Sequence, residues 1–298
     1  MADTLENLVA AELAVPVDPR VAAMAAAIAA RYGPAARAVL FYGSCLRSRE
    51  LDGQMLDFYL IVSSYRDAYG RSWLAPANRL IPPNVFPFEH DGLAAKYAVL
   101  SEADFARECG LGARSVSVYA RFAQPSRLAW AADDRARETA IGAIAQAAPT
   151  LLELTRPTMT DEGAGEVLGI WRKAFALTYG AELRAERTSR PTHIVDTEPD
   201  RYRAFAEAAG FPAARGYTET QRRSSEAAWR HAQRRGKRTT ALRLLKASFT
   251  FAGGIDYLAW KINRHAGTSI AVKPWQRRWP LLGAFTLLPR LLRQKAIR

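Results

Sequence analysis

The stretch YGSCLRSRELDGQMLDFYLIV, Tyr42 to Val62, joins a glycine-serine turn to an apolar run through a polar connection. Gly43 and Ser44 follow one apolar segment, and Asp57 stands thirteen residues after Ser44, near the start of the next. A glycine after a strand lets backbone N–H groups approach phosphate oxygens, and a carboxylate is a hard oxygen ligand for Mg²⁺. The stretch therefore predicts two strands that bring a phosphate-binding turn close to a metal-binding carboxylate.

The polar connection and the second apolar run decide how complete such a site is. Arg47 and Arg49 are placed to hold phosphate oxygens bidentately. A metal site of this kind usually has a second carboxylate two residues after the first, where this chain has Tyr59. Asp52, shortly before the first carboxylate, and Glu89, further along the chain, are the candidates for the second ligand, and we favour Asp52.

Each of these residues also has a purely structural explanation. Gly43 suits an ordinary turn, Asp57 can cap the end of a strand, and Asp52 suits a surface turn. Short motifs of this length also match by chance. The wider sequence is needed to choose between these alternatives.

Patterns around this stretch predict an α/β (α+β) fold. Apolar, β-branched and aromatic runs predict strands at residues 36–44, 55–63 and 93–101, of which the second is buried on both faces. Helices are expected at residues 20–31 and 64–73. Pro82 and Pro83 predict an irregular loop over residues 74–89, and residues 115–130 fit either a strand or a helix.

From Asp133 onward the chain is predicted to be mainly helical. An acidic start and helical spacing favour a helix over residues 133–154, and Thr160 is a good N-cap for the next one. Residues 187–236 are polar and contain three prolines, which predicts a mobile connection or a loosely packed lobe. The expected organisation is a first domain over 1–130, a helical domain over 131–260 and a basic amphipathic segment over 261–298.

Composition excludes several classes of protein. The chain has 298 residues, of which 49% are hydrophobic and 24% charged, so it is not disordered. Its N-terminus is acidic where a signal peptide needs positive charge, and its apolar runs are shorter than the roughly 18 residues of a membrane span. Two cysteines make no disulfide framework. These features predict a cytoplasmic protein without a signal peptide or a transmembrane helix.

Positive charge is concentrated near the C-terminus. Residues 261–298 contain three Lys, six Arg and no acid, and residues 222–246 contain nine Lys or Arg against one Glu. Aromatic and cationic residues alternate there as they do at bilayer interfaces. The predicted membrane contacts are Trp275, Arg277, Arg278, Trp279, Phe285, Arg290 and Arg293. The alternatives are a solvated basic tail and a helix packed on the core.

Four segments together resemble a known family. YGSCLR, LDFYLIV, NRLIPPNVF and AKYAVLS, in this order and spacing, are similar to the mitochondrial-type phosphatidate cytidylyltransferases, the translocator assembly and maintenance proteins, which have bacterial relatives. The similarity extends through YARFAQP to about Gly180. It implies a nucleotidyltransferase domain of the polymerase-beta-like type followed by helices. It also implies Mg²⁺-dependent synthesis of CDP-diacylglycerol from CTP and phosphatidic acid, by a peripheral enzyme on the inner face of the cell membrane.

The resemblance assigns roles residue by residue. Gly43 and Ser44 would bind the triphosphate, with Ser44 also catalytic, and Asp57 would be the catalytic metal ligand. Asn78 and Arg79 match an Asn-Arg pair of the family and would bind the nucleotide. The family is apolar or aromatic at the position of Tyr59, so the missing carboxylate agrees with activity.

Lys96 matches the lysine of the family's KYGV strand, which makes it a catalytic candidate. The residues themselves support this, because a lysine among small apolar residues of a strand needs an anionic partner. A lysine whose side chain reaches solvent from an edge strand is the alternative. A phosphate monoester is already anionic at neutral pH, so the implied reaction needs cations more than a general base.

Two other functions stay open. One is a nucleotidyltransferase that acts on RNA, a small molecule or a protein, and the other is a non-catalytic scaffold, for which Tyr59 is the argument. Nucleic acid is the less favoured partner, because the C-terminal tryptophans lie in leucine-rich sequence. The four histidines lack zinc spacing, residues 110–115 lack a complete dinucleotide motif, and no G-x-S-x-G occurs.

Overall fold

A computed structural model describes residues 4–48, 50–159, 166–181, 190–211, 216–250 and 271–275. Its centre is a five-stranded mixed sheet in the order β3-β4-β2-β1-β5. Neighbouring strands are antiparallel except β2 and β4, which are parallel. The strands are β1 (Ala36–Tyr42), β2 (Met55–Val62), β3 (Asn84–His90), β4 (Leu93–Ser101) and β5 (Ser126–Ala131).

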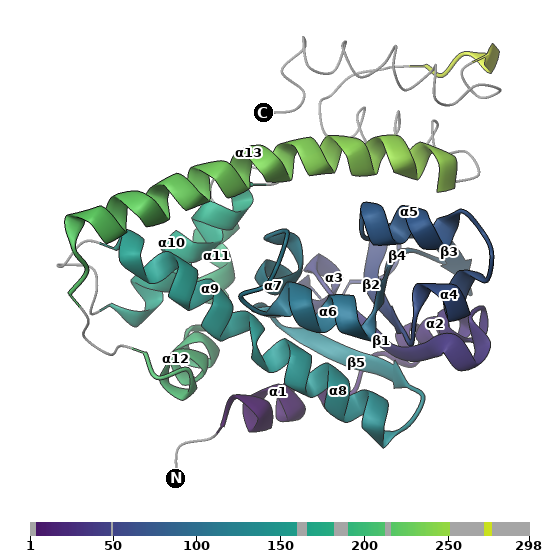
Figure 1. Ribbon diagram of the computed structural model, residues 1–298. Helices are drawn as coiled ribbons and strands as arrows, with labels where there is room; N and C mark the ends of the chain where they lie inside the picture. Colours follow the sequence, from purple (N-terminus) through teal and green to yellow (C-terminus); the bar gives the residue numbers. More distant parts are fainter. Residues whose placement is uncertain are drawn as a thin grey trace.

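Helices cover both faces of this sheet (Figure 1). They are α1 (Leu5–Leu13), α2 (Pro19–Ala30), α3 (Ser44–Ser48), α4 (Tyr65–Tyr69), α5 (Leu74–Leu80), α6 (Glu102–Cys109), α7 (Ser117–Phe122), α8 (Asp134–Ala145), α9 (Ala147–Thr155), α10 (Val167–Tyr179), α11 (Arg190–Thr197), α12 (Pro199–Ala208) and α13 (Glu219–Thr250), with 3₁₀ turns at Gly33–Ala35 and Arg156–Thr158. The described chain is therefore a mixed α/β structure followed by a largely helical region.

The two faces of the sheet belong to two hydrophobic clusters. Phe58 and Tyr97 face α2, whereas Tyr59 and Leu100 face the cluster formed with α6 to α10 and α12. Because successive side chains of a strand alternate between faces, Asp57 and Lys96 lie on the second face. This confirms the predicted strands and the burial of β2 on both sides.

Side-chain caps set where several helices begin. Asp133 accepts a hydrogen bond from the N–H of Ala136 at 2.7 Å and binds both terminal nitrogens of Arg37. Ser101 caps α6 in the same manner through the N–H of Asp104. The helix start predicted at Asp133 is confirmed, but Gln146 divides the helix predicted over residues 133–154 into α8 and α9. Thr160 lies outside the described residues.

The irregular loop predicted over residues 74–89 is wrong. Leu74–Leu80 form α5 and Asn84–His90 form β3, and the two prolines lie between them. Pro87 is tolerated within β3 because that strand is at an edge of the sheet, where a missing N–H costs least. The segment left open between strand and helix, residues 115–130, contains both, because α7 is followed by β5.

The mobile connection or loose lobe predicted over residues 187–236 is also wrong for the described part. These residues form α11, α12 and the first half of α13, a helix of 32 residues. Polar contacts fasten α13: Trp229 Nε1 donates to the carbonyl of Leu154 at 2.9 Å, and Gln233 Nε2 to that of Leu177 at 3.1 Å. Because side-chain hydrogen bonds make these contacts, they produce no helical period of apolar residues in the sequence.

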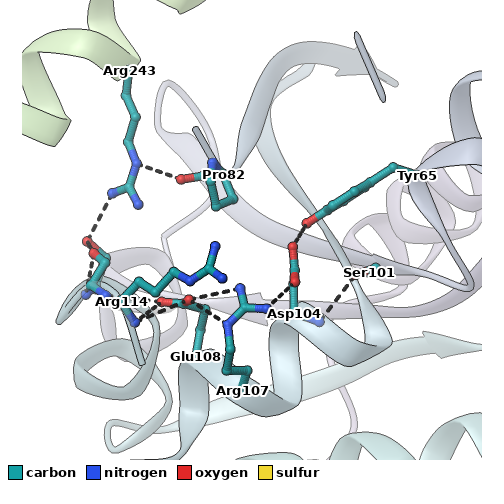
Figure 2. A network of polar contacts seen from close by, with 10 residues as sticks. Tyr65, Pro82, Ser101, Asp104, Arg107, Glu108, Arg114 and Arg243 are labelled. Carbon is teal, nitrogen blue, oxygen red and sulfur yellow. Dashed lines mark hydrogen bonds and ion pairs between the residues drawn. The ribbon is translucent and has the colours of Figure 1, made fainter. Parts of the chain in front are cut away.

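Two cationic side chains in the second half of α13 bind the loop before β3. Arg243 Nε donates to the carbonyl of Pro82 at 2.7 Å and Nη1 to Ser117 Oγ at 3.2 Å (Figure 2). Lys246 is buried and its ammonium donates to the carbonyls of Ile81 and Pro83. Both halves of α13 are therefore attached to the body of the protein.

Figure 2 shows how this attachment continues beneath the loop. Glu108, which is 3% exposed, accepts hydrogen bonds from the Arg107 side chain and from the N–H groups of Arg114 and Ser115. Buried carboxylates are stable only when paired in this way. The glycine-rich segment at 110–115 is thus tied down by a carboxylate of α6.

Burial, and secondarily the charge of Arg243, lowers the pKa of Lys246 to about 7. The unfolded chain keeps an ordinary lysine pKa near 10.4. Between these values the unfolded state binds more protons, so the free energy of unfolding rises with pH by at most about 1.4 kcal/mol per pH unit. Below pH 7 the buried ammonium lowers stability in full.

Lys246→Met is expected to remove this pH dependence. Urea unfolding of the parent and the variant, at about pH 7 and about pH 9, should give a parent stability that gains more with pH than the variant's. Equal gains in the two proteins would show that Lys246 keeps an ordinary pKa when folded.

No helix within the described ranges is long and apolar enough to cross a bilayer. Cys45 and Cys109 are both buried free thiols.

Candidate functional site

The glycine turn and the carboxylate meet at one end of the sheet. β1 ends at Tyr42, and the antiparallel register places that residue opposite Asp57 of β2. Gly43 follows with φ +99°, and a Cβ added to it would lie 3.2 Å from Asp57 Oδ2. Only glycine adopts this conformation without strain, so the turn passes directly against the carboxylate.

Lys96 lies beside the same carboxylate. It is the register partner of Asp57 on the parallel strand β4, and its Nζ is 2.8 Å from Asp57 Oδ1. The side chains are 32% and 21% exposed, respectively, so the ion pair is partly screened by solvent and open to a ligand. The anionic partner that the sequence demanded for Lys96 is, within the protein, Asp57.

The pKa of the nearby Cys45 thiol depends on the charges of Asp57 and Lys96. This thiol is buried, and Sγ lies 3.7 Å from the carbonyl of Met55. Burial raises the pKa of the Cys45 thiol, and the negative charge of Asp57 raises it further, while Lys96 acts in the opposite direction. The thiol is therefore neutral near pH 7 and is not a nucleophile.

Tyr59 belongs to the hydrophobic core. It is 2% exposed, and its ring centroid lies 5.4 Å from that of Tyr42 and 5.3 Å from that of Phe122. The side chain that follows Asp57 on the same face thus fixes the strand against α7. A metal-binding carboxylate at this position would be buried among aromatic rings.

The structure does not bring Asp52 to Asp57. Arg20 Nη1 donates to Asp52 Oδ1 at 2.9 Å, and Arg20 starts α2 on the opposite face of the sheet. Glu89 is exposed on β3, two strands from Asp57 and on the same face. Among the described residues, no three His, Cys, Asp or Glu side chains are grouped so that they could hold a metal ion.

One protein carboxylate nevertheless fits the way Mg²⁺ is bound with nucleotides. This ion keeps several waters and takes one or two carboxylates plus substrate phosphates. Asp57 is partly exposed, and its Oδ2 faces a glycine that leaves room on that side. Asp57 would hold an ion that arrives with the triphosphate, without a closed set of protein ligands.

A further cation at this end was missed from the sequence. The guanidinium carbon of Arg121 lies 5.8 Å from the ring centroid of Tyr42, and its Nη1 donates to the carbonyl of Ser117 at 3.0 Å. Tyr42 is the register partner of Asp57, so Arg121 borders the same site. Arg121 could have been placed at this site only if α7 had been predicted as a helix, and the sequence of residues 115–130 fits either a strand or a helix.

The remaining predicted nucleotide contacts lie in different settings. Ser44 is exposed at the start of α3, next to the turn. Asn78 is fully buried: its Nδ2 donates to the carbonyl of Val99 at 2.9 Å, and its Oδ1 accepts from the N–H of Asn84. The Asn78 amide thus holds the start of β3. Arg79 is exposed.

Several predicted contacts lie outside the described part of the chain. They are Arg49 and the side chain of Arg47 near the turn, and Arg277, Arg278, Trp279, Phe285, Arg290 and Arg293 in the basic segment. Of the predicted membrane contacts, Trp275 is described, and it is 42% exposed.

No protein-family model matches this chain, and no curated protein matches its sequence.

Proposed function

We propose that this protein is a nucleotidyltransferase of the polymerase-beta-like type that makes CDP-diacylglycerol from CTP and phosphatidic acid. The observation that carries the proposal is the Asp57–Lys96 pair packed against the left-handed Gly43 at one end of the sheet. The order and spacing of the four sequence segments that contain these residues favour the lipid acceptor. The enzyme would work as a peripheral protein on the inner face of the cell membrane.

The chain's own residues bind and orient two anions. The backbone at Gly43 and the hydroxyl of Ser44 take the triphosphate, and Asp57 would be the protein ligand of Mg²⁺. When bound, Mg²⁺ supplies positive charge that offsets the charge of the leaving pyrophosphate. Lys96 and Arg121 offset the repulsion between the nucleotide and the acceptor phosphate.

The transfer is a single displacement at phosphorus. An oxygen of the phosphatidic acid phosphate forms a bond to the α-phosphorus of CTP, the bond to the bridging oxygen breaks, and pyrophosphate leaves. The attacking phosphate is already ionised at neutral pH, because its second pKa is near 6. A site with one carboxylate and several cations suits this acceptor better than a hydroxyl, which needs a general base.

A non-catalytic scaffold is the second candidate, and one observation favours it. Lys96 already neutralises Asp57, and a metal ion must compete with that ammonium for the carboxylate. A scaffold of this kind would not bind CTP more tightly in the presence of Mg²⁺. Equilibrium binding of CTP with Mg²⁺ and with EDTA separates the two functions.

The direct test is product formation. The protein is incubated with CTP labelled at the α-phosphate, Mg²⁺ and detergent-dispersed phosphatidic acid, and labelled CDP-diacylglycerol is expected. ATP, GTP and UTP in place of CTP test the base, and RNA or diacylglycerol in place of phosphatidic acid tests the acceptor. Label transferred to RNA, or no transfer to any acceptor, would contradict the proposal.

A further inference from the structure

One face of α13 packs against the rest of the protein. Trp229, Gln233, Arg243 and Lys246 all point to the body of the molecule, where their side chains donate to main-chain carbonyls. Gly236 passes so close to Ala181 that a side chain there would overlap the neighbouring backbone. At 100° per residue these positions lie within one side of the helix.

The opposite face carries a row of arginines. Arg223, Arg230, Arg234 and Arg238 recur at intervals of seven and four residues, and all four are exposed. These intervals keep the side chains on one line along a helix, and at 1.5 Å per residue the line is about 22 Å long. We call these four residues the arginine stripe.

The charge of the arginine stripe is only partly balanced. Arg223 pairs with Glu219 at 2.7 Å, and Arg230 lies 3.6 Å from Glu226. Arg234 and Arg238 form no ion pair with any residue that the structure describes. Residues 219–250 contain nine Lys or Arg and two Glu, so the outward field of α13 is positive.

We infer that the arginine stripe is a docking surface for the anionic phosphates of a lipid bilayer. The inference rests on the proposed function, in which the acceptor is a membrane lipid. A straight row of guanidinium groups matches a flat array of phosphates, and arginine binds phosphate bidentately. The contact is distinct from the basic segment predicted at 261–298.

The side chains of α13 favour lipid over nucleic acid. Single-stranded nucleic acid is usually held by aromatic side chains that stack on bases beside the cations. The tryptophan of α13, Trp229, is 5% exposed and lies on the inner face. The arginine stripe therefore offers charge without that stacking surface.

The position of α13 allows a matched control. Figure 1 shows α13 along one side of the molecule, with α8 and α12 on the opposite side. Arg135 and Arg137 of α8 and Arg203 of α12 are also exposed arginines. A triple variant at these positions changes the same charge on a different surface.

The test compares two full-length variants with the parent. One is Arg230→Gln/Arg234→Gln/Arg238→Gln, and the control is Arg135→Gln/Arg137→Gln/Arg203→Gln. Binding to phosphatidylcholine vesicles with and without phosphatidylglycerol is measured by sedimentation at low salt. The stripe variant should lose affinity for the anionic vesicles by about 100-fold, because each arginine contributes about a fivefold factor, while the control stays near the parent.

Three results would overturn the inference: unchanged vesicle affinity in a folded stripe variant, an equal loss in both variants, or a loss of single-stranded RNA binding with unchanged vesicle binding. Because residues 261–298 are retained throughout, the difference reports α13 alone. Activity with CTP and detergent-dispersed phosphatidic acid is assayed separately. A stripe variant that loses vesicle binding while the parent makes no CDP-diacylglycerol would refute the proposed function but not the docking surface.

Discussion

Asp57→Asn is expected to reduce cytidylyl transfer by about three orders of magnitude, because a metal ligand at the reacting phosphates supplies several kcal/mol of stabilisation to the transition state. The asparagine keeps the shape of the side chain but removes the charge that pairs with Lys96 and that, in the proposed mechanism, would bind the ion. The measurement is the rate of labelled CDP-diacylglycerol formation at saturating CTP and Mg²⁺.

The fold should survive this substitution. The Asp57–Lys96 pair is partly exposed, and ion pairs of that kind contribute about 0–1 kcal/mol to stability. Thermal unfolding of the variant should therefore stay close to that of the parent. Asp134→Asn is a suitable control, because this carboxylate is 96% exposed at the start of α8.

Asp52→Asn tests whether Asp52 is a metal ligand, as the sequence predicts, or only a partner of Arg20, as the structure indicates. The sequence favoured Asp52 as the second metal ligand, whereas its carboxylate contacts Arg20 on the far side of the sheet. On that geometry Asp52→Asn keeps most of the activity. A loss as large as that of Asp57→Asn would mean that Asp52 moves to the metal during turnover, and unchanged activity of Asp57→Asn would remove Asp57 from the mechanism.

The strands of the site could be predicted because their signal is local. β2 is rich in aromatic and β-branched residues and β4 is a run of apolar residues around one lysine, and the period of two of a strand puts Lys96 on the face opposite Tyr97. An anionic partner for Lys96 could also be predicted, since a lysine among small apolar residues of a strand needs one. Its protein partner was not, because Asp57 meets it only through the parallel pairing of β2 and β4.

Two of the missed elements, β3 and the first half of α13, depend on tertiary contacts. β3 contains Pro87, which local propensity excludes from a strand, yet an edge position tolerates it. The first half of α13 is polar, and its helix is held by side-chain donors such as Gln233. Neither contact has a counterpart in the local pattern, which explains why residues 74–89 and 187–236 were predicted as irregular.

The ion pair between Glu12 and Arg201 is a long-range contact of this kind. Arg201 Nε lies 2.5 Å from Glu12 Oε2, Nη2 lies 3.1 Å from Oε1, and Nη1 donates to the carbonyl of Ala123. The Arg201 side chain is 9% exposed and lies 4.2 Å from the ring centroid of Phe205. The pair connects α1 to α12 across 189 positions of sequence.

Removing one member of this pair should be strongly destabilising. Burial lowers the pKa of Arg201, but the combined interactions with Glu12, Tyr202 and Glu198 outweigh burial and the net pKa is raised, so the guanidinium stays charged in the folded protein. Glu12→Gln leaves that buried charge without the carboxylate paired with it, and such changes cost about 3–5 kcal/mol of unfolding free energy. Urea denaturation followed by circular dichroism measures the loss.

The double variant Glu12→Gln/Arg201→Met tests whether the cost comes from the stranded charge. Replacing both ions removes the desolvation penalty of each, so the double variant should be more stable than Glu12→Gln alone. Arg203→Met on the same helix breaks an exposed pair with Asp200 and should cost less than about 1 kcal/mol. If Glu12→Gln cost no more than this control, α1 and α12 would be held together by apolar packing, and the ion pair would be incidental to the fold.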